Sequence, residues 1–317
     1  MQQCILVLFM KDTGRRETMR DDFAVFILTH GRADNMATAK MLKKTHYTGK
    51  IYFIIDNEDE QAERYRELFG KESVIEFDKQ KAYDHTDTMD NFNNHSAIIY
   101  ARNESFRIAK ELGLKYFLML DDDYRDIHFR YRDGEKLKAK NIRDMDAIFE
   151  VMIHFLDVVK EISGGGSCAI AFAQGGDFVG GVKKKSANFN KRVLRKAMNS
   201  LFCRTDCPIE FRGTMNEDVT TYTTLGSRGN LFFTICDICV LQLPTQSLAG
   251  GMTEAYTESG TYLKTFYSVM SMPSCVKVSM MYTEHKRIHH RIDWERCVPK
   301  ILNQRYRKEE SDVRHCR

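Results

Sequence analysis

The segment YFLMLDDDY, residues 116–124, decides how the chain is interpreted. It begins with five apolar residues in a row, which is typical of a strand that a parallel sheet buries on both faces. Three aspartates follow at once. In open α/β sheets, ligands bind outside the carboxyl ends of the strands. The segment therefore predicts a central strand that delivers carboxylates to a binding site.

The residues before this strand alternate between apolar strands and helical stretches. Strands joined in this way form right-handed crossovers within one parallel sheet. We expect an α/β fold with a Rossmann-type, mostly parallel central sheet flanked by helices. The expected strands are residues 23–28, 51–55 and 74–77, and the expected helices are 33–44, 59–69 and 96–112.

The second half of the chain is less regular. Residues 142–162 carry apolar side chains at helical spacing, as a helix packed on a core does. Further helices are expected at 217–225 and 257–270, and further strands at 169–173, 231–243 and 275–281. Cys236 and Cys239 lie in one of these strands and face opposite sides, which disfavours a zinc site.

The composition indicates a folded, water-soluble chain. Of 317 residues, 43% are hydrophobic and 29% are charged, and only four are Pro, which disfavours long disordered linkers. The net charge of +4 excludes a strongly basic packaging protein. No apolar run reaches the roughly 18 residues of a membrane span. Nine Cys in no repeat predict reduced thiols and a cytoplasmic location.

The pattern favours one α/β domain over residues 21–302. We expect the second half of this domain, residues 125–302, to carry added elements. Residues 1–20 are expected to be an N-terminal extension, because their apolar run lacks the features of a signal peptide; Met19 is as plausible a start as Met1. Residues 303–317 are expected to be a basic tail.

The aspartates at 121–123 predict a metal site. In an extended chain, residues two apart face the same side, so Asp121 and Asp123 converge while Asp122 points elsewhere. Carboxylates this close repel each other unless a cation or a set of donors offsets them. Mg²⁺ and Mn²⁺ prefer such oxygen ligands and share them with substrate phosphates. The alternative interpretation is a solvated turn or a helix cap.

Polar residues at the other strand ends predict a nucleotide site on the same rim. The segment Thr29-His30-Gly31-Arg32 follows the first strand, and Asp56 follows the second. An acidic residue at the end of the second strand can accept hydrogen bonds from a ribose or a base. Arg102, in the helix before the aspartates, offers a planar fork for a diphosphate. Each motif alone is also ordinary loop chemistry.

Two further motifs have both a chemical and a simpler interpretation. Glu217 and Asp218 begin a predicted helix, where they either cap its dipole or supply a general base. His289 and His290, in the segment EHKRIHHRI, either complete the metal shell or lie on the surface beside Lys and Arg.

A basic cluster follows the Gly-rich segment. Residues 183–196 hold seven Lys or Arg and no acid. Such a cluster beside a cleft fits a polyanion such as DNA, although a solvated surface has the same composition. The expected DNA contacts are Lys183, Lys184, Lys185, Lys191 and Arg192.

The order of these motifs resembles the GT-A superfamily of nucleotide-sugar glycosyltransferases. More narrowly, it resembles the TET-associated glycosyltransferases of phages and their relatives, which are proposed to modify oxidised or hydroxymethylated pyrimidines in DNA. The resemblance runs from about residue 22 to about residue 302. Its segments are 29–32, 101–104, 120–124, 213–218, 250–254, 288–294 and 299–300.

The resemblance implies a GT-A-like fold, with residues 21–124 as the nucleotide-binding half and 125–302 as the acceptor-binding half, and a role for each motif. Asp121-Asp122-Asp123 matches the Asp-x-Asp metal motif, and Glu217-Asp218 matches the motif that activates the acceptor. His289 or His290 matches a third metal ligand. The implied reaction is metal-dependent, inverting transfer of a hexose or pentose from a UDP-sugar to 5-hydroxymethylcytosine or 5-hydroxymethyluracil in DNA, with Mn²⁺ or Mg²⁺. The nucleotide-sugar set comprises Thr29, His30, Gly31, Arg32, Asp56, Arg102 and Asp122.

Two alternatives remain open from the sequence. One is another nucleotide-dependent transferase that hypermodifies pyrimidines on the same scaffold, releases pyrophosphate from DNA and needs no UDP-sugar. The other is a non-catalytic nucleic-acid-binding module, which would show steep salt dependence and no metal dependence.

Overall fold

The computed structural model describes residues 18–91, 93, 95–164, 166, 168–175, 199–242, 253–282 and 286–298, with the backbone alone for Cys168 and 253–261. Most of the expected N-terminal extension, the whole basic cluster and the expected tail lie outside these residues.

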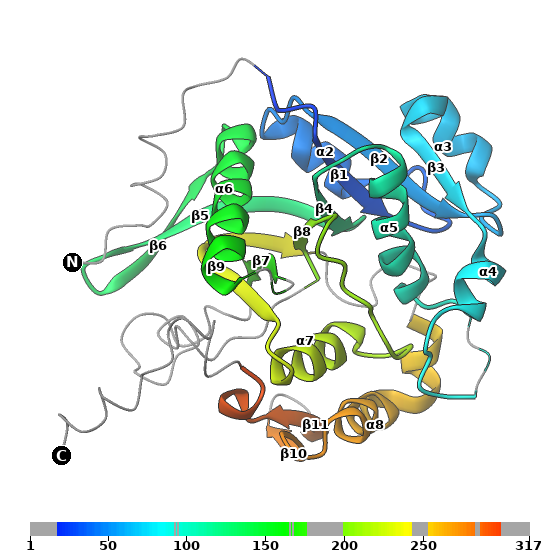
Figure 1. The fold of residues 1–317 in the computed structure, drawn as a ribbon, viewed down its shortest axis with the longest axis vertical. Coiled ribbons are helices and arrows are strands. Elements are labelled where there is room, and N and C mark those ends of the chain that lie inside the picture. The colour runs from blue at the N-terminus through cyan, green and yellow to red at the C-terminus, as the bar shows by residue number, and fades with distance from the viewer. Residues whose placement is uncertain are drawn as a thin grey trace.

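A nine-stranded sheet forms the centre of the molecule, in the order β3-β2-β1-β4-β8-β7-β9-β5-β6 (Figure 1). Its strands are β1 (Phe23–Leu28), β2 (Lys50–Asp56), β3 (Val74–Phe77), β4 (Tyr116–Asp121), β5 (Tyr124–Asp133), β6 (Lys136–Asn141), β7 (Cys168–Gln174), β8 (Leu201–Arg204) and β9 (Leu231–Gln242). The first four strands are parallel, and β7 is parallel to β9. Strands β8 and β5 run antiparallel to their neighbours. The predicted α/β class with a mostly parallel sheet is confirmed.

Helices cover both faces of this sheet. They are α2 (Ala37–Lys44), α3 (Ala62–Phe69), α4 (Lys79–Asp84), α5 (Ile99–Glu111), α6 (Met145–Ser163), α7 (Glu217–Ser227) and α8 (Thr253–Ser271), with short 3-10 turns η1 (Lys71–Ser73) and η4 (Trp294–Arg296). Alternate residues of β1 enter different hydrophobic clusters, because successive strand residues face opposite sides. Val25 packs with residues of α2 and α6, whereas Phe26 packs with residues of α5. This two-sided burial explains why the strand is apolar throughout.

The register of the parallel strands sets the position of the site. Leu28, the last residue of β1, pairs with Asp121, the last residue of β4, and with Ile54 of β2. The strands therefore end at nearly the same level. Their following loops meet at one rim, as the sequence predicted.

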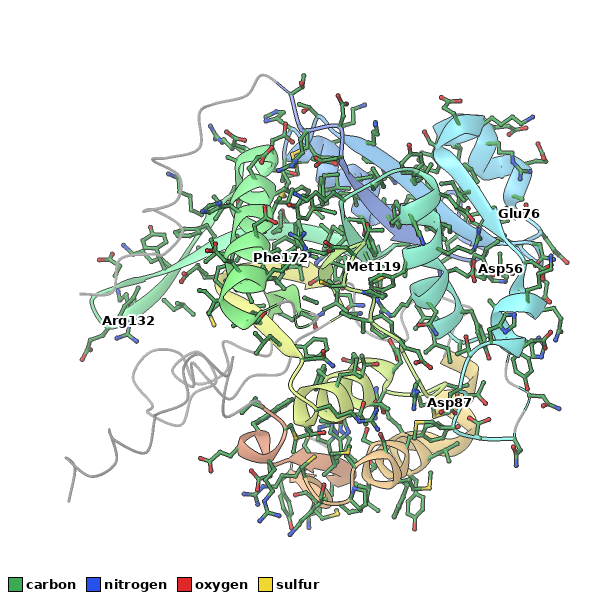
Figure 2. The ribbon with its side chains drawn as sticks, in the orientation of Figure 1. Asp56, Glu76, Asp87, Met119, Arg132 and Phe172 are labelled. Atoms are coloured by element: carbon green, nitrogen blue, oxygen red, sulfur yellow. The ribbon has the colours of Figure 1, made fainter. Side chains whose placement is uncertain are left out.

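Three features were not expected from the sequence. They are the β5–β6 hairpin, the short strand β8 and the short helix α4. Nearly every residue of β6 is exposed, so its pattern carries no signal of burial. Its alternating lysines are typical of an edge strand that is protected from further pairing. Figure 2 shows Arg132 at the outer end of this hairpin and Met119 and Phe172 in the interior.

A second, two-stranded sheet lies beside α7 and α8 (Figure 1). It pairs β10 (Val276–Tyr282) with β11 (Lys286–Ile292) in antiparallel fashion. Among the described helices, none is long and apolar enough to cross a membrane.

Candidate active site

The aspartate loop turns sharply where β4 ends. Asp121 is the last residue of β4, Asp122 and Asp123 form a turn, and Tyr124 begins β5. The expected extended geometry therefore stops at Asp121. Thr38 of α2 holds the turn: its hydroxyl donates to the Asp121 carbonyl at 2.6 Å and accepts from the Tyr124 N–H at 3.0 Å.

Replacing Thr38 by Val should destabilise the protein by about 1–3 kcal/mol, because a buried carbonyl and a buried N–H would lose their partner. Urea unfolding measures this change. Thr223→Val is a matched control, since Thr223 is equally buried but its hydroxyl donates only to carbonyls of its own helix. Equal losses for the two variants would show that the Thr38 contacts do not fix the loop.

Asp121 is held from two sides. Its Oδ1 accepts from Arg102 Nη2 at 3.1 Å, and its Oδ2 accepts from the Asn199 side chain. Burial raises the pKa of Asp121 to about 7; Arg102 opposes this rise, while Asp123 and Glu217 add to it. The carboxyl group therefore carries its charge at a cost that a nearby cation would reduce.

Asp123 provides the second oxygen donor. Its Oδ2 accepts from Gln242 at 3.0 Å, whereas its Oδ1 is buried and has no hydrogen-bond partner among the residues that the structure describes. Burial raises the pKa of Asp123. A buried, unpartnered carboxylate oxygen next to a second carboxylate fits a hard divalent cation that takes few protein ligands. These two residues suit the metal that the sequence predicted.

The predicted histidine ligands are not grouped with the aspartates. Within the described part of the chain, no three His, Cys, Asp or Glu side chains form a group that could hold a metal ion. His290 Nδ1 lies 3.4 Å from the Asn216 side chain, and its ring stacks on that of His289. The register of β11 against β10 places both rings in the smaller sheet. His285, which precedes these two histidines in the segment EHKRIHHRI, lies outside the described residues.

Arg102 occupies a different environment from the one expected. It is only 1% exposed, and its guanidinium bonds to Asp121, to the Asn199 carbonyl and, through Nε, to Glu217 Oε1 at 3.2 Å. A buried charge needs such partners to offset its desolvation. Arg102 therefore joins the aspartate loop to the start of α7 and does not reach outward to a ligand.

The pair at the start of α7 divides into two environments. Burial raises the pKa of Glu217, with Arg102 opposing the rise and Asp218 adding to it. Asp218 is half-buried in the first turn, where the helix dipole favours a carboxylate. The preceding residue, Asn216, has a left-handed backbone with φ of 53° and bonds to Ser268 of α8.

The loop after β1 is built around Asp122 and Tyr65. Thr29 Oγ1 donates to Asp122 Oδ2 at 2.8 Å, and Arg32 Nη1 donates to Asp122 Oδ1 at 3.0 Å. The Tyr65 hydroxyl accepts from the Arg32 N–H at 2.8 Å. The structure thus brings Thr29, Arg32 and Asp122 together, as expected for one rim.

His30 and Asp56 form an ion pair at the outer part of this rim. His30 Nδ1 lies 2.7 Å from Asp56 Oδ2, and this hydrogen bond raises the pKa of His30. Burial alone would raise the pKa of Asp56, but His30 and Lys79 outweigh it and lower that pKa. The Gly31 N–H donates to Asp59, and the positive φ of 66° at Gly31 suits a residue without Cβ. In Figure 2, Asp56 lies near Glu76 of β3.

Four residues of this site were missed by the sequence reasoning. Gln242 ends β9 and lies one residue before the end of the predicted strand, so the strand-end argument that found Asp56 could have found it. No sequence signal marks the others, which act through contacts between distant segments. The missed residues are Thr38, Tyr65, Asn199 and Gln242.

The fold is an α/β fold whose central sheet carries a cluster of carboxylates at the carboxyl edge of its parallel strands. A model of the TET-Associated Glycosyltransferase family matches residues 23–251, and the chain belongs to that family. The protein is therefore a glycosyltransferase.

Comparison with solved structures gives distant likenesses. Glucosyl-3-phosphoglycerate synthase from Mycobacterium tuberculosis, in complex with Mn²⁺, UDP and phosphoglyceric acid, has 9% identity and a TM-score of 0.41, over 85% of this chain and 86% of that one. The same enzyme with Mn²⁺, UDP and glucosyl-3-phosphoglycerate has 10% identity and a TM-score of 0.40, over 88% of each chain. Comparison with curated proteins finds no match.

Proposed function

We propose that this glycosyltransferase moves a sugar from a UDP-sugar to the hydroxymethyl group of a modified pyrimidine in DNA, with a divalent cation. The observation that carries the proposal is the pair of partly buried carboxylates, Asp121 and Asp123, of which one oxygen has no hydrogen-bond partner among the described residues. Membership of the family supports the sugar transfer. The DNA acceptor follows from the family's name and the sequence resemblance.

Asp121 and Asp123 would hold Mn²⁺ or Mg²⁺. When bound, the cation supplies Lewis-acid stabilisation of the charge that develops on the departing diphosphate. Gln242 and Asn199 orient the two carboxylates from outside, through the hydrogen bonds described above. Such outer partners fix ligand geometry in metal sites.

The rim after β1 and β2 would bind the uridine diphosphate. Thr29, Arg32 and Asp122 form one hydrogen-bonded unit, so the loop holds its shape before the donor arrives. We assign His30, Gly31 and Asp56 to the nucleoside, because His30 is half-exposed and Asp56 is fixed beside it. Preorganisation of this kind reduces the entropy that binding costs.

We propose that Asp218 accepts the proton of the acceptor hydroxyl, while Glu217 keeps Arg102 in place. Glu217 already bonds to the buried guanidinium, whereas Asp218 lies next to it in the first turn of α7, also half-buried. A base that faces the sugar opposite the leaving diphosphate implies inversion at the anomeric carbon. Arg102 then acts as a positioning residue that keeps the base and the aspartate loop in fixed relation.

The acceptor does not have to leave the duplex. A hydroxymethyl group at C5 of a pyrimidine projects into the major groove, where the edge of the base is accessible. We keep Lys183, Lys184, Lys185, Lys191 and Arg192 as proposed DNA contacts; they lie outside the described residues.

The test of the proposed function is a product analysis. The protein is incubated with DNA containing 5-hydroxymethylcytosine or 5-hydroxymethyluracil, several UDP-sugars and Mn²⁺, and the DNA is digested for nucleoside mass measurement. A mass increase of one sugar, absent with unmodified DNA, is expected. Unchanged nucleosides with every donor would contradict the proposal, and release of pyrophosphate would favour the alternative transferase. Family membership disfavours the non-catalytic module.

Binding of Mn²⁺ should tighten as the pH rises from 6 to 8. The pKa of Asp121 is raised to about 7, so below that pH a proton occupies the carboxyl group that the cation needs. Loss of one competing proton changes affinity by up to about tenfold per pH unit. Calorimetric titration of Mn²⁺ at pH 6, 7 and 8 measures this trend. An Mn²⁺ affinity that does not change with pH would contradict the assignment of Asp121 to the cation site.

A further inference from the structure

The smaller sheet and α8 expose an unusual share of the large hydrophobic side chains. Of eight such side chains exposed in the described part of the chain, five lie on α8 and β10. Tyr282, at the end of β10, is 75% exposed. A patch of exposed hydrophobic side chains often marks a surface that binds another molecule. The five are Tyr262, Met270, Val278, Met280 and Tyr282.

Strands β10 and β11 form a hairpin, and this β10–β11 hairpin carries positive charge that no acidic residue of its strands balances. Lys277 of β10 pairs directly with Arg291 of β11, and both are exposed. Like charges opposite each other destabilise a sheet unless a partner neutralises them. Arg287 and Lys286 add two more exposed cations on β11. Neither strand contains an Asp or Glu.

These four cations form no ion pair with any residue in the described ranges, although many exposed cations elsewhere do. Arg64 and Arg66, for example, bond to nearby carboxylates on the surface of α3. The Arg287 guanidinium donates to the neutral Met281 sulfur at 3.4 Å. The hairpin therefore presents cations that are available to an anionic ligand.

The hairpin is attached to the proposed catalytic segment. His290 of β11 lies 3.4 Å from Asn216, which immediately precedes Glu217 and Asp218. Asn216 also donates to the Lys264 carbonyl of α8 at 2.7 Å, and Thr265 of α8 bonds to the Ile288 carbonyl of β11. A ligand held by the hairpin would thus be carried on the same support as the proposed base.

We infer that the β10–β11 hairpin is a docking surface for the acceptor DNA. This inference rests on the proposed function, which makes DNA the acceptor. A two-stranded antiparallel ribbon has the width to enter the major groove, where the hydroxymethyl group of the acceptor projects. Lys277, Arg287 and Arg291 contact phosphates, and the exposed ring of Tyr282 contacts sugars or bases at the hairpin tip.

The test uses the full chain with Lys277→Gln, Arg287→Gln and Arg291→Gln combined. Affinity for duplex DNA is expected to fall about tenfold or more at low salt, and the slope of log affinity against log salt should decrease by about 2 to 3. The KM for modified DNA should rise. Hydrolysis of the UDP-sugar without acceptor, and transfer to a free modified nucleoside, should not change.

A matched variant removes the same charge elsewhere, with Lys110→Gln, Lys136→Gln and Lys140→Gln. These side chains are exposed on α5 and β6 and form no ion pair with any residue that the structure describes. The matched variant should bind DNA as the wild type does. If it loses affinity while the hairpin variant keeps it, the inference is overturned; unchanged duplex binding by the hairpin variant also overturns it.

Two further arms keep the test decisive. Arg287→Gln alone should reduce the salt slope by about 1, which covers the case in which the triple variant does not fold. Tyr282→Ala should raise the KM for DNA, and Tyr282→Phe should have the same KM as the wild type. The binding arm requires no catalysis: a wild type that binds DNA through the hairpin but transfers no sugar refutes the proposed function and not the docking surface.

Discussion

Asp121→Asn is expected to lower sugar transfer by about a thousandfold or more. The change keeps the size of the side chain but removes the charge that holds the cation. Metal stabilisation of a leaving diphosphate is worth several kcal/mol, and about 4 kcal/mol corresponds to a factor of about 10³. The measurement is kcat/KM with UDP-sugar, Mn²⁺ and modified DNA.

Asp133→Asn is the matched control for this variant. Asp133 ends β5 and forms an ion pair with Lys138 at the exposed end of the β5–β6 hairpin, far from the sheet rim that carries Asp121. Its replacement should leave transfer unchanged, since exposed ion pairs contribute little. Asp121→Asn with more than a tenth of the wild-type rate, in a folded protein, would contradict the cation site.

Asp218→Asn should lower kcat by about 10²–10⁴, the usual contribution of a positioned general base. KM for the donor should change little, because the Asp121 and Thr29 regions are untouched. The measurement is kcat at saturating donor and acceptor.

Glu217→Gln separates the two adjacent carboxylates. It removes one ionic partner of buried Arg102, so we expect a lower free energy of unfolding, by about 3–5 kcal/mol at most. Its effect on kcat, measured in folded protein, should be smaller than that of Asp218→Asn. The reverse order of the two effects on kcat would make Glu217 the base and contradict our assignment.

The sheet's first half was predictable because burial on both faces demands apolar residues. The strands at 23–28 and 74–77 match the expected bounds, and β4 extends by one residue to Asp121. The hairpin of β5 and β6 was missed, since exposed strands do not need an apolar pattern.

The site was predictable only where it follows from strand ends. The position of Asp121 was predictable, because it ends β4. The expectation that Asp121 and Asp123 face the same side assumed an extended chain, but the chain turns at Asp122. Burial of Arg102 depends on Asp121 and Glu217, 19 and 115 positions away, and no local pattern records that pairing. The placement of His290 depends likewise on the register of the smaller sheet, which the sequence did not reveal.

The most direct test of the central claim is the affinity for UDP with and without Mn²⁺. If Asp121 and Asp123 hold a cation on the diphosphate, UDP should bind at least about tenfold more tightly with Mn²⁺, a gain of about 1.4 kcal/mol. The gain should disappear when Asp121→Asn and Asp123→Asn are combined. Equal affinity with and without Mn²⁺ in the wild type would contradict the account.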